Sequence, residues 1–276
     1  MHACRTALLL LGLMSAAHAE DRFTRLMGWG GGDPATIVPD AAAVGFTDLI
    51  VWNKDPVYLA KLVEAAQPYG IDIYCSLWLG DQQDWTARYP DLKPPLQPLS
   101  DEETALLATQ EAELKAGTSR HQHGGEPVEG RLELLESELL CFHHPEVMEF
   151  FRAQLRDICK VPGLAGIAFD YFGYRNYRCC RCPLSQELLA RYRQAHPELS
   201  APAALDQFSL ETLTGCGNQL ADYARSLKPG LKVTGHVYPV FLPEPLYGNR
   251  LNWDTCGQTV AWFFEPFWTT EKIRNY

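Results

Sequence analysis

The chain has 276 residues, which suits one large domain or two small ones. With 46% hydrophobic and 21% charged residues it can build a core, so disorder is excluded as its main state. Its 34 acidic residues outnumber 24 Lys and Arg residues, giving a net charge of -10. Nucleic-acid backbones and anionic membrane surfaces would repel such a chain, so neither is an expected partner.

Residues 1–19 have the form of a secretory signal peptide. Arg5 precedes the apolar run at 7–14, and Ala17-His18-Ala19 matches an A-x-A cleavage site. The run is too short to span a hydrocarbon core of about 30 Å, so we expect no membrane anchor. The sequence therefore predicts a secreted or periplasmic protein whose mature part forms one domain over residues 20–276.

Eight of the nine cysteines lie beyond Cys4. An even number in an exported chain favours disulfides, although their pairing cannot be derived from spacing. We expect the cluster at 179–182 to form local disulfides with Cys141, Cys216 or Cys256. The alternative is a zinc site using Cys180, Cys182 and another ligand, although no second pair of cysteines completes a four-thiolate set.

Strands alternate with helices along most of the chain. Strands are predicted over residues 26–30, 46–52, 71–78, 164–170, 231–237 and 259–264. Helices are predicted over residues 38–44, 55–69, 144–158, 185–194 and 205–227. The fourth strand is apolar up to its last residue, Asp170, as expected for a strand buried on both faces.

Residues 80–140 interrupt this alternation and are predicted to form an irregular insertion. Prolines at 90, 94, 95 and 98 indicate a loop. Ser100 followed by Glu103 has the form of a helix-capping box, and the helix should reach about Lys115. Long insertions of this kind in compact domains are usually functional or disordered.

Repeated strand–helix units predict an α/β fold with a parallel sheet, best described as an eight-stranded β/α (TIM) barrel. A doubly wound sheet is the alternative, but no G-x-G-x-x-G follows the first strand. Six strands are predicted, two fewer than a closed barrel needs. We therefore expect a barrel truncated after about six β/α units; the other possibility is that the insertion contains further strands.

Most predicted strands end in an aromatic residue beside a polar one, and a β/α barrel carries its active site at these ends. Aromatic faces stack on sugar rings, and short acids and amides bind sugar hydroxyls, so we expect a carbohydrate site. The alternative is that the rings merely pack the rim of the barrel. The candidate substrate-binding residues are Trp29, Trp52, Asn53, Trp78, Tyr171, Tyr174, His236 and Trp268.

Asp170 is the candidate catalytic residue, because an acid ending an apolar strand is costly unless it meets water, a partner or a ligand. A pairing with Arg175, Arg178 or a backbone amide is the alternative role. Glycoside cleavage needs two carboxylates, and Glu265, just past the sixth strand, is the preferred general acid. Weaker candidates for that partner are Glu244 and Asp81.

The stretch HPEV at 144–147, a helix, and LAGIAFDYFGY at 164–174 resemble bacterial glycoside hydrolase-like proteins with a β/α barrel and a fourth strand of the form DGIHFDYIRY. The resemblance covers residues 140–195 well and 25–80 loosely. It implies that Asp170 is the acid at the end of the fourth strand, and by analogy with α-galactosidase-like enzymes Asp170 is the nucleophile and Glu265 the acid/base. Cys180 and Cys182 match the first two cysteines of a C-x-C-x-x-C pattern in these proteins, and Ser185 replaces the third.

The sequence thus predicts an exported glycoside hydrolase-like protein that cleaves a poly- or oligosaccharide with a pair of carboxylates. We expect no cofactor and no metal in this site, and no oligomeric state is predicted. A non-catalytic carbohydrate-binding protein on the same scaffold is the main alternative. A structural exported protein stapled by its cysteine cluster is another.

Overall fold

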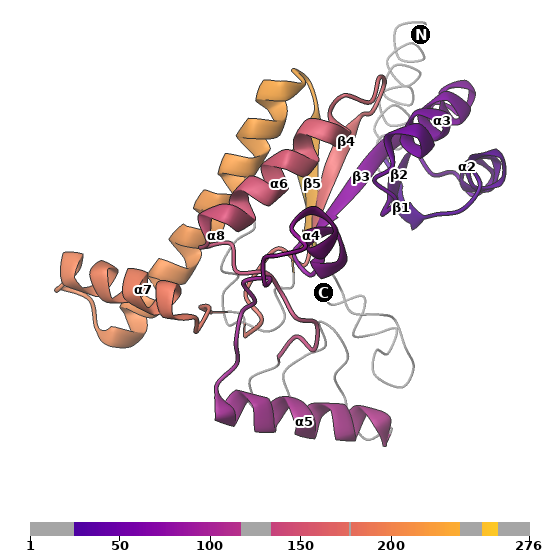
Figure 1. Cartoon of the computed structure of the whole chain (residues 1–276). Helices are drawn as coiled ribbons and strands as arrows, with labels where there is room; N and C mark the ends of the chain where they lie inside the picture. Colours follow the sequence, from indigo (N-terminus) through magenta and orange to yellow (C-terminus); the bar gives the residue numbers. More distant parts are fainter. Residues whose placement is uncertain (1–24, 117–133, 177, 238–249, 259–276) are drawn as a thin grey trace, which may run out of the picture.

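The structure is a computed structural model that describes residues 25–116, 134–176, 178–237 and 250–258 (Figure 1). Its centre is a sheet of six described strands: β1 (Met27–Gly30), β2 (Asp48–Val51), β3 (Asp72–Trp78), β4 (Gly166–Asp170), β5 (Lys232–Val237) and β6 (Thr255–Gln258). The predicted signal peptide lies outside the described residues. Each strand pairs in parallel with the next one along the chain.

This strand order decides between the two predicted α/β folds. A doubly wound sheet reverses its order at a switch point, and the order β1-β2-β3-β4-β5-β6 has no reversal. The sheet is therefore wound in one direction, as in a β/α barrel. The described residues contain six such strands, so the structure is a curled half-barrel; a closed barrel of eight strands is not seen among them.

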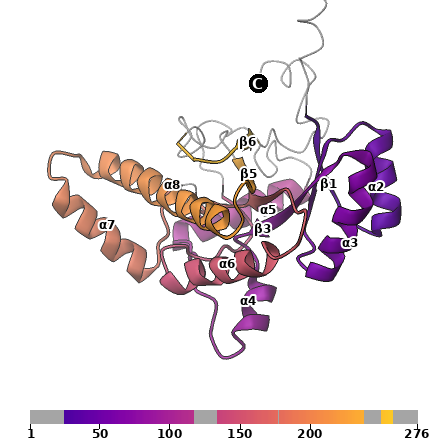
Figure 2. The same ribbon diagram turned by 90° about the horizontal axis from the view of Figure 1, so that it is seen from above.

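The helices that follow the strands are α2 (Pro34–Ala43), α3 (Pro56–Ala66), α6 (Pro145–Ile158), α7 (Pro183–Ala195) and α8 (Ala201–Leu227), and the 3-10 turn η1 (Gln67–Tyr69) extends α3. Both views place α2 and α3 at one end of the sheet and α7 at the other (Figures 1 and 2). None of the described helices is long and apolar enough to cross a bilayer.

Two predicted helix starts need correction, and one of them is that of α8, which begins at Ala201 and not at 205. Helix α2 begins four residues before the predicted start, because Asp33 accepts a hydrogen bond from the Ala35 amide at 3.0 Å and Pro34 takes the first helical position. Strand β6 occupies residues 255–258, and the predicted sixth strand at 259–264 lies outside the described residues.

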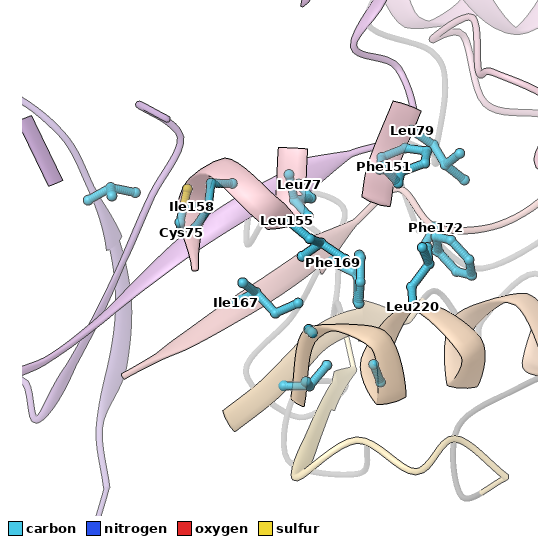
Figure 3. Close-up of a cluster of buried hydrophobic side chains, with 14 of the residues drawn as sticks. Cys75, Leu77, Leu79, Phe151, Leu155, Ile158, Ile167, Phe169, Phe172 and Leu220 are labelled. Atoms are coloured by element: carbon cyan, nitrogen blue, oxygen red, sulfur yellow. The ribbon is translucent and has the colours of Figure 1, made fainter. Parts of the chain in front are cut away.

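One face of the sheet is covered by helices and forms the core (Figure 3). Side chains alternate between the two faces of a strand, so every second residue points to the helices. These residues are almost entirely apolar, and they lie in one buried cluster with side chains from α6 and α8. Figure 3 labels members of this cluster: Cys75, Leu77, Ile167 and Phe169 from the strands, Phe151, Leu155 and Ile158 from α6, and Leu220 from α8.

The insertion contains two helices, α4 (Gln82–Arg88) and α5 (Asp101–Lys115). The predicted capping box is confirmed: the Glu103 amide donates to Ser100 Oγ at 3.1 Å, and the Ser100 amide donates to the Glu103 carboxylate at 2.8 Å. Helix α4 was not predicted, and it begins where Asp81 accepts a hydrogen bond from the Asp84 amide. In Figure 1, α5 lies beyond α4, apart from the helices that cover the sheet.

The eight cysteines beyond Cys4 are all free thiols in the structure, which corrects the expectation of local disulfides. Two members of the expected pairs do lie close together, Cys141 and Cys182. Their sulfur atoms are 3.7 Å apart, whereas a disulfide bond is about 2.05 Å long. The two thiols are thus neighbours without being bonded.

Candidate functional site at the strand ends

The sheet face opposite the helices carries most of the predicted site residues. Ile50, Tyr74 and Ala168 form a small buried cluster there with Met27 and Trp29, separate from the main core. Beyond this cluster, toward the carboxyl ends of the strands, Trp78 is in register with Asp170. Phe169 pairs with Gly235, so the next residues along, Asp170 and His236, lie at the same level of the sheet.

A contact between two distant strands shows that this face is concave. The rings of Trp29 on β1 and His236 on β5 have centroids 4.9 Å apart. In a flat sheet four strand spacings of about 4.8 Å would hold these strands about 19 Å apart, too far for the two rings to touch. The sheet must therefore curl toward this face, which brings the ends of nonadjacent strands around a common space.

Two pairs of aromatic rings lie near the carboxyl ends of the strands. Trp29 and Trp52 are stacked, with centroids 4.7 Å apart and planes at 22°. Trp52 is 52% exposed, so one large ring of this stack is presented to solvent. Trp78 and Tyr171 form the second pair at 5.6 Å. The Trp78 ring packs against Gly80, because a Cβ atom built on this glycine would lie only 2.5 Å from the indole.

Asp170, the last residue of β4, and Tyr171, which follows it, form a strained turn. Tyr171 has a φ of 50°, and it is the one residue other than glycine with positive φ among those the structure describes. Its amide donates a hydrogen bond to Asp170 Oδ1 at 3.0 Å. Left-handed backbone at a bulky residue costs free energy, and such strain concentrates at functional sites. Here it fixes the orientation of a carboxylate at the end of a strand.

Three buried polar atoms on this face have no hydrogen-bond partner among the described residues: Ser76 Oγ, Trp78 Nε1 and His236 Nδ1. Buried polar groups in native proteins are nearly always paired, so each of these atoms calls for an explanation. Burial lowers the pKa of His236, which keeps its imidazole neutral at neutral pH. The face therefore offers neutral hydrogen-bonding groups next to aromatic surfaces.

Of the alternative partners proposed for Asp170, a backbone amide is found, that of Tyr171, whereas the two arginines bind other groups. Arg175 donates to the carbonyl oxygens of Leu135, at 3.1 Å, and Glu136, at 3.3 Å. Arg178 forms an ion pair with Asp206.

Asp81, a weaker candidate for the second carboxylate, is paired with Lys54 and caps α4. Its carboxylate therefore has a structural role and is not the second carboxylate beside Asp170. Glu244, the other weaker candidate, lies outside the described residues, as do Glu265 and Trp268.

Two predicted residues stand apart from this group. Asn53 is exposed, and its Oδ1 accepts a hydrogen bond from the Asp55 amide at 2.9 Å, so this atom supports the start of α3. Tyr174 is only 1% exposed; its ring packs on Phe142 and its hydroxyl donates to the Ser209 carbonyl. A buried ring cannot contact a substrate, so Tyr174 is corrected to a core residue.

Ser76 was missed by sequence analysis. Its position was available from the alternation of Tyr74, Ser76 and Trp78 along β3, which puts all three on one face.

No family model matches the chain, and none of the curated proteins matches it. Among solved structures it is similar to an exo-β-N-acetylglucosaminidase from Vibrio harveyi, with 11% identity and a TM-score of 0.49 over 87% of this chain and 38% of that chain. It is also similar to β-galactosidases from Marinomonas ef1, with 10% identity and a TM-score of 0.48 over 90% and 43% of the two chains, and from Rahnella sp. R3, with 12% and 0.43 over 78% and 36%. The chain thus spans well under half the length of each of these proteins, and we assign neither substrate nor residue roles from them.

Proposed function

We propose that the chain is an exported glycoside hydrolase-like protein that binds a poly- or oligosaccharide at the carboxyl ends of its strands and cleaves a glycosidic bond. The observation that carries this proposal is the grouping of two aromatic ring pairs near the carboxyl ends of β1 to β4, where Trp78 is in register with Asp170. Sugar rings stack on aromatic faces, and their hydroxyls would pair with the buried polar atoms of Trp78 and His236.

In this proposal Asp170 acts as nucleophile or general base and Glu265 as general acid. The Tyr171 amide would hold this carboxylate in a fixed orientation at the end of β4. If the two carboxyl groups lie about 5–5.5 Å apart, the reaction should retain anomeric configuration; at about 6.5–9.5 Å it should invert. A separation beyond about 12 Å would exclude this pairing.

The two ring pairs also favour an oligosaccharide over a single sugar. Trp29 lies in β1 and Trp52 directly follows β2, whereas Trp78 ends β3 and Tyr171 directly follows β4. Separate stacking surfaces can hold separate sugar units, so we expect a monosaccharide to bind more weakly than its oligomers.

The test is reducing-sugar release from a panel of polysaccharides, comparing the wild-type protein with Asp170→Asn. Release should fall by at least about a thousandfold, since loss of a catalytic carboxylate removes several kcal/mol of transition-state stabilisation. The matched control is Asp55→Asn, at the acid just past β2, because asparagine also caps helices well. The control should keep its activity, and equal release from wild type and Asp170→Asn would refute the catalytic role.

A non-catalytic carbohydrate-binding protein is the second candidate. It is favoured by the roles of the acids that follow β2 and β3, because Asp55 and Asp81 both cap helices. Among the described strand ends, neither of these acids therefore supplies the second carboxylate that glycoside cleavage needs. This candidate predicts glycan binding by the folded wild type and by Asp170→Asn, with no bond cleavage by either. Release of reducing sugar that depends on Asp170 would exclude it.

A further inference from the structure

We propose that Cys141, His144 and Cys182 bind a structural zinc ion, with Cys180 as the fourth ligand. One ligand atom from each of the first three residues lies within 4.8 Å of the other two. Cys141 ends the insertion, His144 is the residue before α6, and Cys182 is the residue before α7. Cys141 and His144 thus lie three residues apart in one segment, and the fold brings Cys182 to them from a second segment.

The separations between these atoms fit zinc ligands. Tetrahedral zinc with Zn–S of about 2.3 Å and Zn–N of about 2.05 Å holds two sulfurs about 3.8 Å apart, and a sulfur and a nitrogen about 3.6 Å apart. The Cys141 and Cys182 sulfurs are 3.7 Å apart, and Cys182 Sγ lies 3.6 Å from His144 Nε2. The same sulfur distance is well above that of a disulfide.

His144 is oriented as metal-binding histidines usually are. Its Nδ1 lies 3.3 Å from the Glu146 carboxylate, and its Nε2 faces the thiols. A carboxylate on the far nitrogen of this kind fixes the tautomer and the ring direction of a zinc ligand. The preceding residue, His143, differs: its Nδ1 contacts Ser185 Oγ at 2.5 Å and its Nε2 contacts the Tyr174 hydroxyl at 3.3 Å. Both of its nitrogens are used, so His143 is not a ligand.

The sulfur of Cys182 lies among hydrogen-bond donors at the start of a helix. Its sulfur is the N-terminal cap of α7 and accepts a hydrogen bond from the Ser185 amide at 3.4 Å. Ser185 Oγ lies 3.1 Å from the same sulfur. Amide donors and the positive end of a helix favour negative charge.

Cys180 is a further sulfur donor two residues before Cys182. Its side chain is buried, and its sulfur accepts a hydrogen bond from the Cys182 amide at 3.4 Å. It would complete a set of three sulfurs and one imidazole, which is a common set for closed structural zinc sites. The sulfur ligands disfavour magnesium and calcium, which prefer oxygen.

Zinc here would tie the end of the insertion to the starts of α6 and α7. A second link already joins the same regions: Arg181, between the two cysteines, donates to the Glu103 carboxylate of α5 at 2.7 and 2.8 Å. Cys141 and Cys182 are at most 6% exposed, so the site would be closed to substrate. Its role would be structural, and it does not depend on the carbohydrate proposal.

The first experiment measures the zinc content of the full chain, purified under reducing conditions without chelator. The second removes bound metal with a chelator and records the absorption spectrum while Co²⁺ is added. We expect one zinc per chain and a sulfur-to-cobalt charge-transfer band. Cys182→Ala and His144→Ala should each lower zinc affinity by at least about a hundredfold, and Glu146→Gln by about 10–100-fold. Cys180→Ala should lower zinc affinity about as much as Cys182→Ala. A clearly smaller loss would mean that water can replace the Cys180 thiol, and it would overturn the assignment of the fourth ligand.

The matched control is His196→Ala. His196 also adjoins a helix end and its Nδ1 also contacts a glutamate two residues on, Glu198, at 3.2 Å, but it is not in the thiol group. Zinc affinity should not change in this variant. Wild-type protein that binds neither zinc nor Co²⁺ would overturn the proposal whether or not the variants fold. A Cys141–Cys182 disulfide in mass-spectrometric mapping of metal-free native protein would also overturn it.

Discussion

The two faces of the sheet are built from neighbouring residues of the same strands, yet they differ in chemistry. On β4, Ile167 and Phe169 are fully buried against the helices (Figure 3). Asp170, the next residue, lies at the candidate site. On β3, Cys75 and Leu77 point to the helices, and Ser76 and Trp78 point the other way. The helix-covered face is apolar and closely packed, whereas the concave face keeps polar atoms without partners among the described residues.

This difference separates stability from binding. Apolar burial on the helix-covered face supplies the free energy that holds the fold. The strand ends give up some of that free energy, through polar atoms that have no partner among the described residues and through the positive φ of Tyr171. Substitutions on one face should therefore change the free energy of unfolding, and those on the other face should change ligand affinity or pH dependence.

The largest expected effect is that of Phe169→Ala on the helix-covered face. The ring is fully buried and contacts the rings of Phe172 and Trp253, so its removal should lower the free energy of unfolding by about 3–5 kcal/mol. Urea denaturation measures this loss. The control Phe169→Leu keeps much of the volume and should lose clearly less. A loss below about 1 kcal/mol for the alanine variant would mean that this face is not the main core.

On the concave face, Trp52→Ala should show the opposite pattern. The ring is half exposed, so the free energy of unfolding should fall by at most about 1.5 kcal/mol, the value of one aromatic pair. Affinity for an oligosaccharide found in the substrate panel should fall about tenfold, as measured by titration calorimetry. Tyr69→Ala is the control, because Tyr69 is equally exposed but precedes β3, away from the carboxyl ends of the strands. Unchanged affinity in Trp52→Ala would remove this ring from the site.

Much of the fold could be predicted because its regular elements repeat at short range. The alternation along β3, the apolar run of β4 and the 3.6-residue period of α6 each lie within one segment. The start of α2 was missed because Pro39 resembles a first-turn proline, whereas it lies inside the helix that Asp33 caps.

Contacts between irregular segments could not be predicted in the same way. Cys141 and Cys182 are separated by 41 residues and meet through loops that have no periodic pattern. Tyr174 follows Asp170 closely in sequence, but after the left-handed turn at Tyr171 its ring enters the core. The strand-end group was predicted better, since parallel strands bring their carboxyl ends to one edge whatever their loops do.

The smallest expected effect is a pH dependence from His236 on the concave face. Burial lowers its pKa in the folded state below the ordinary value of 6.5, so the unfolded chain binds a proton first as pH falls. Its contribution to stability is complete above about pH 6.5 and is lost as pH falls from there through the folded pKa. The slope of unfolding free energy against pH from this one group cannot exceed about 1.4 kcal/mol per pH unit.

Urea denaturation between about pH 5 and 8 should show a shallower slope for His236→Gln than for the wild type. Thr234→Val, on the same face of β5 but not titratable, should keep the wild-type slope. An unchanged slope in His236→Gln would mean that His236 is hydrated in the folded protein, and the concave face would then be open to water at this strand.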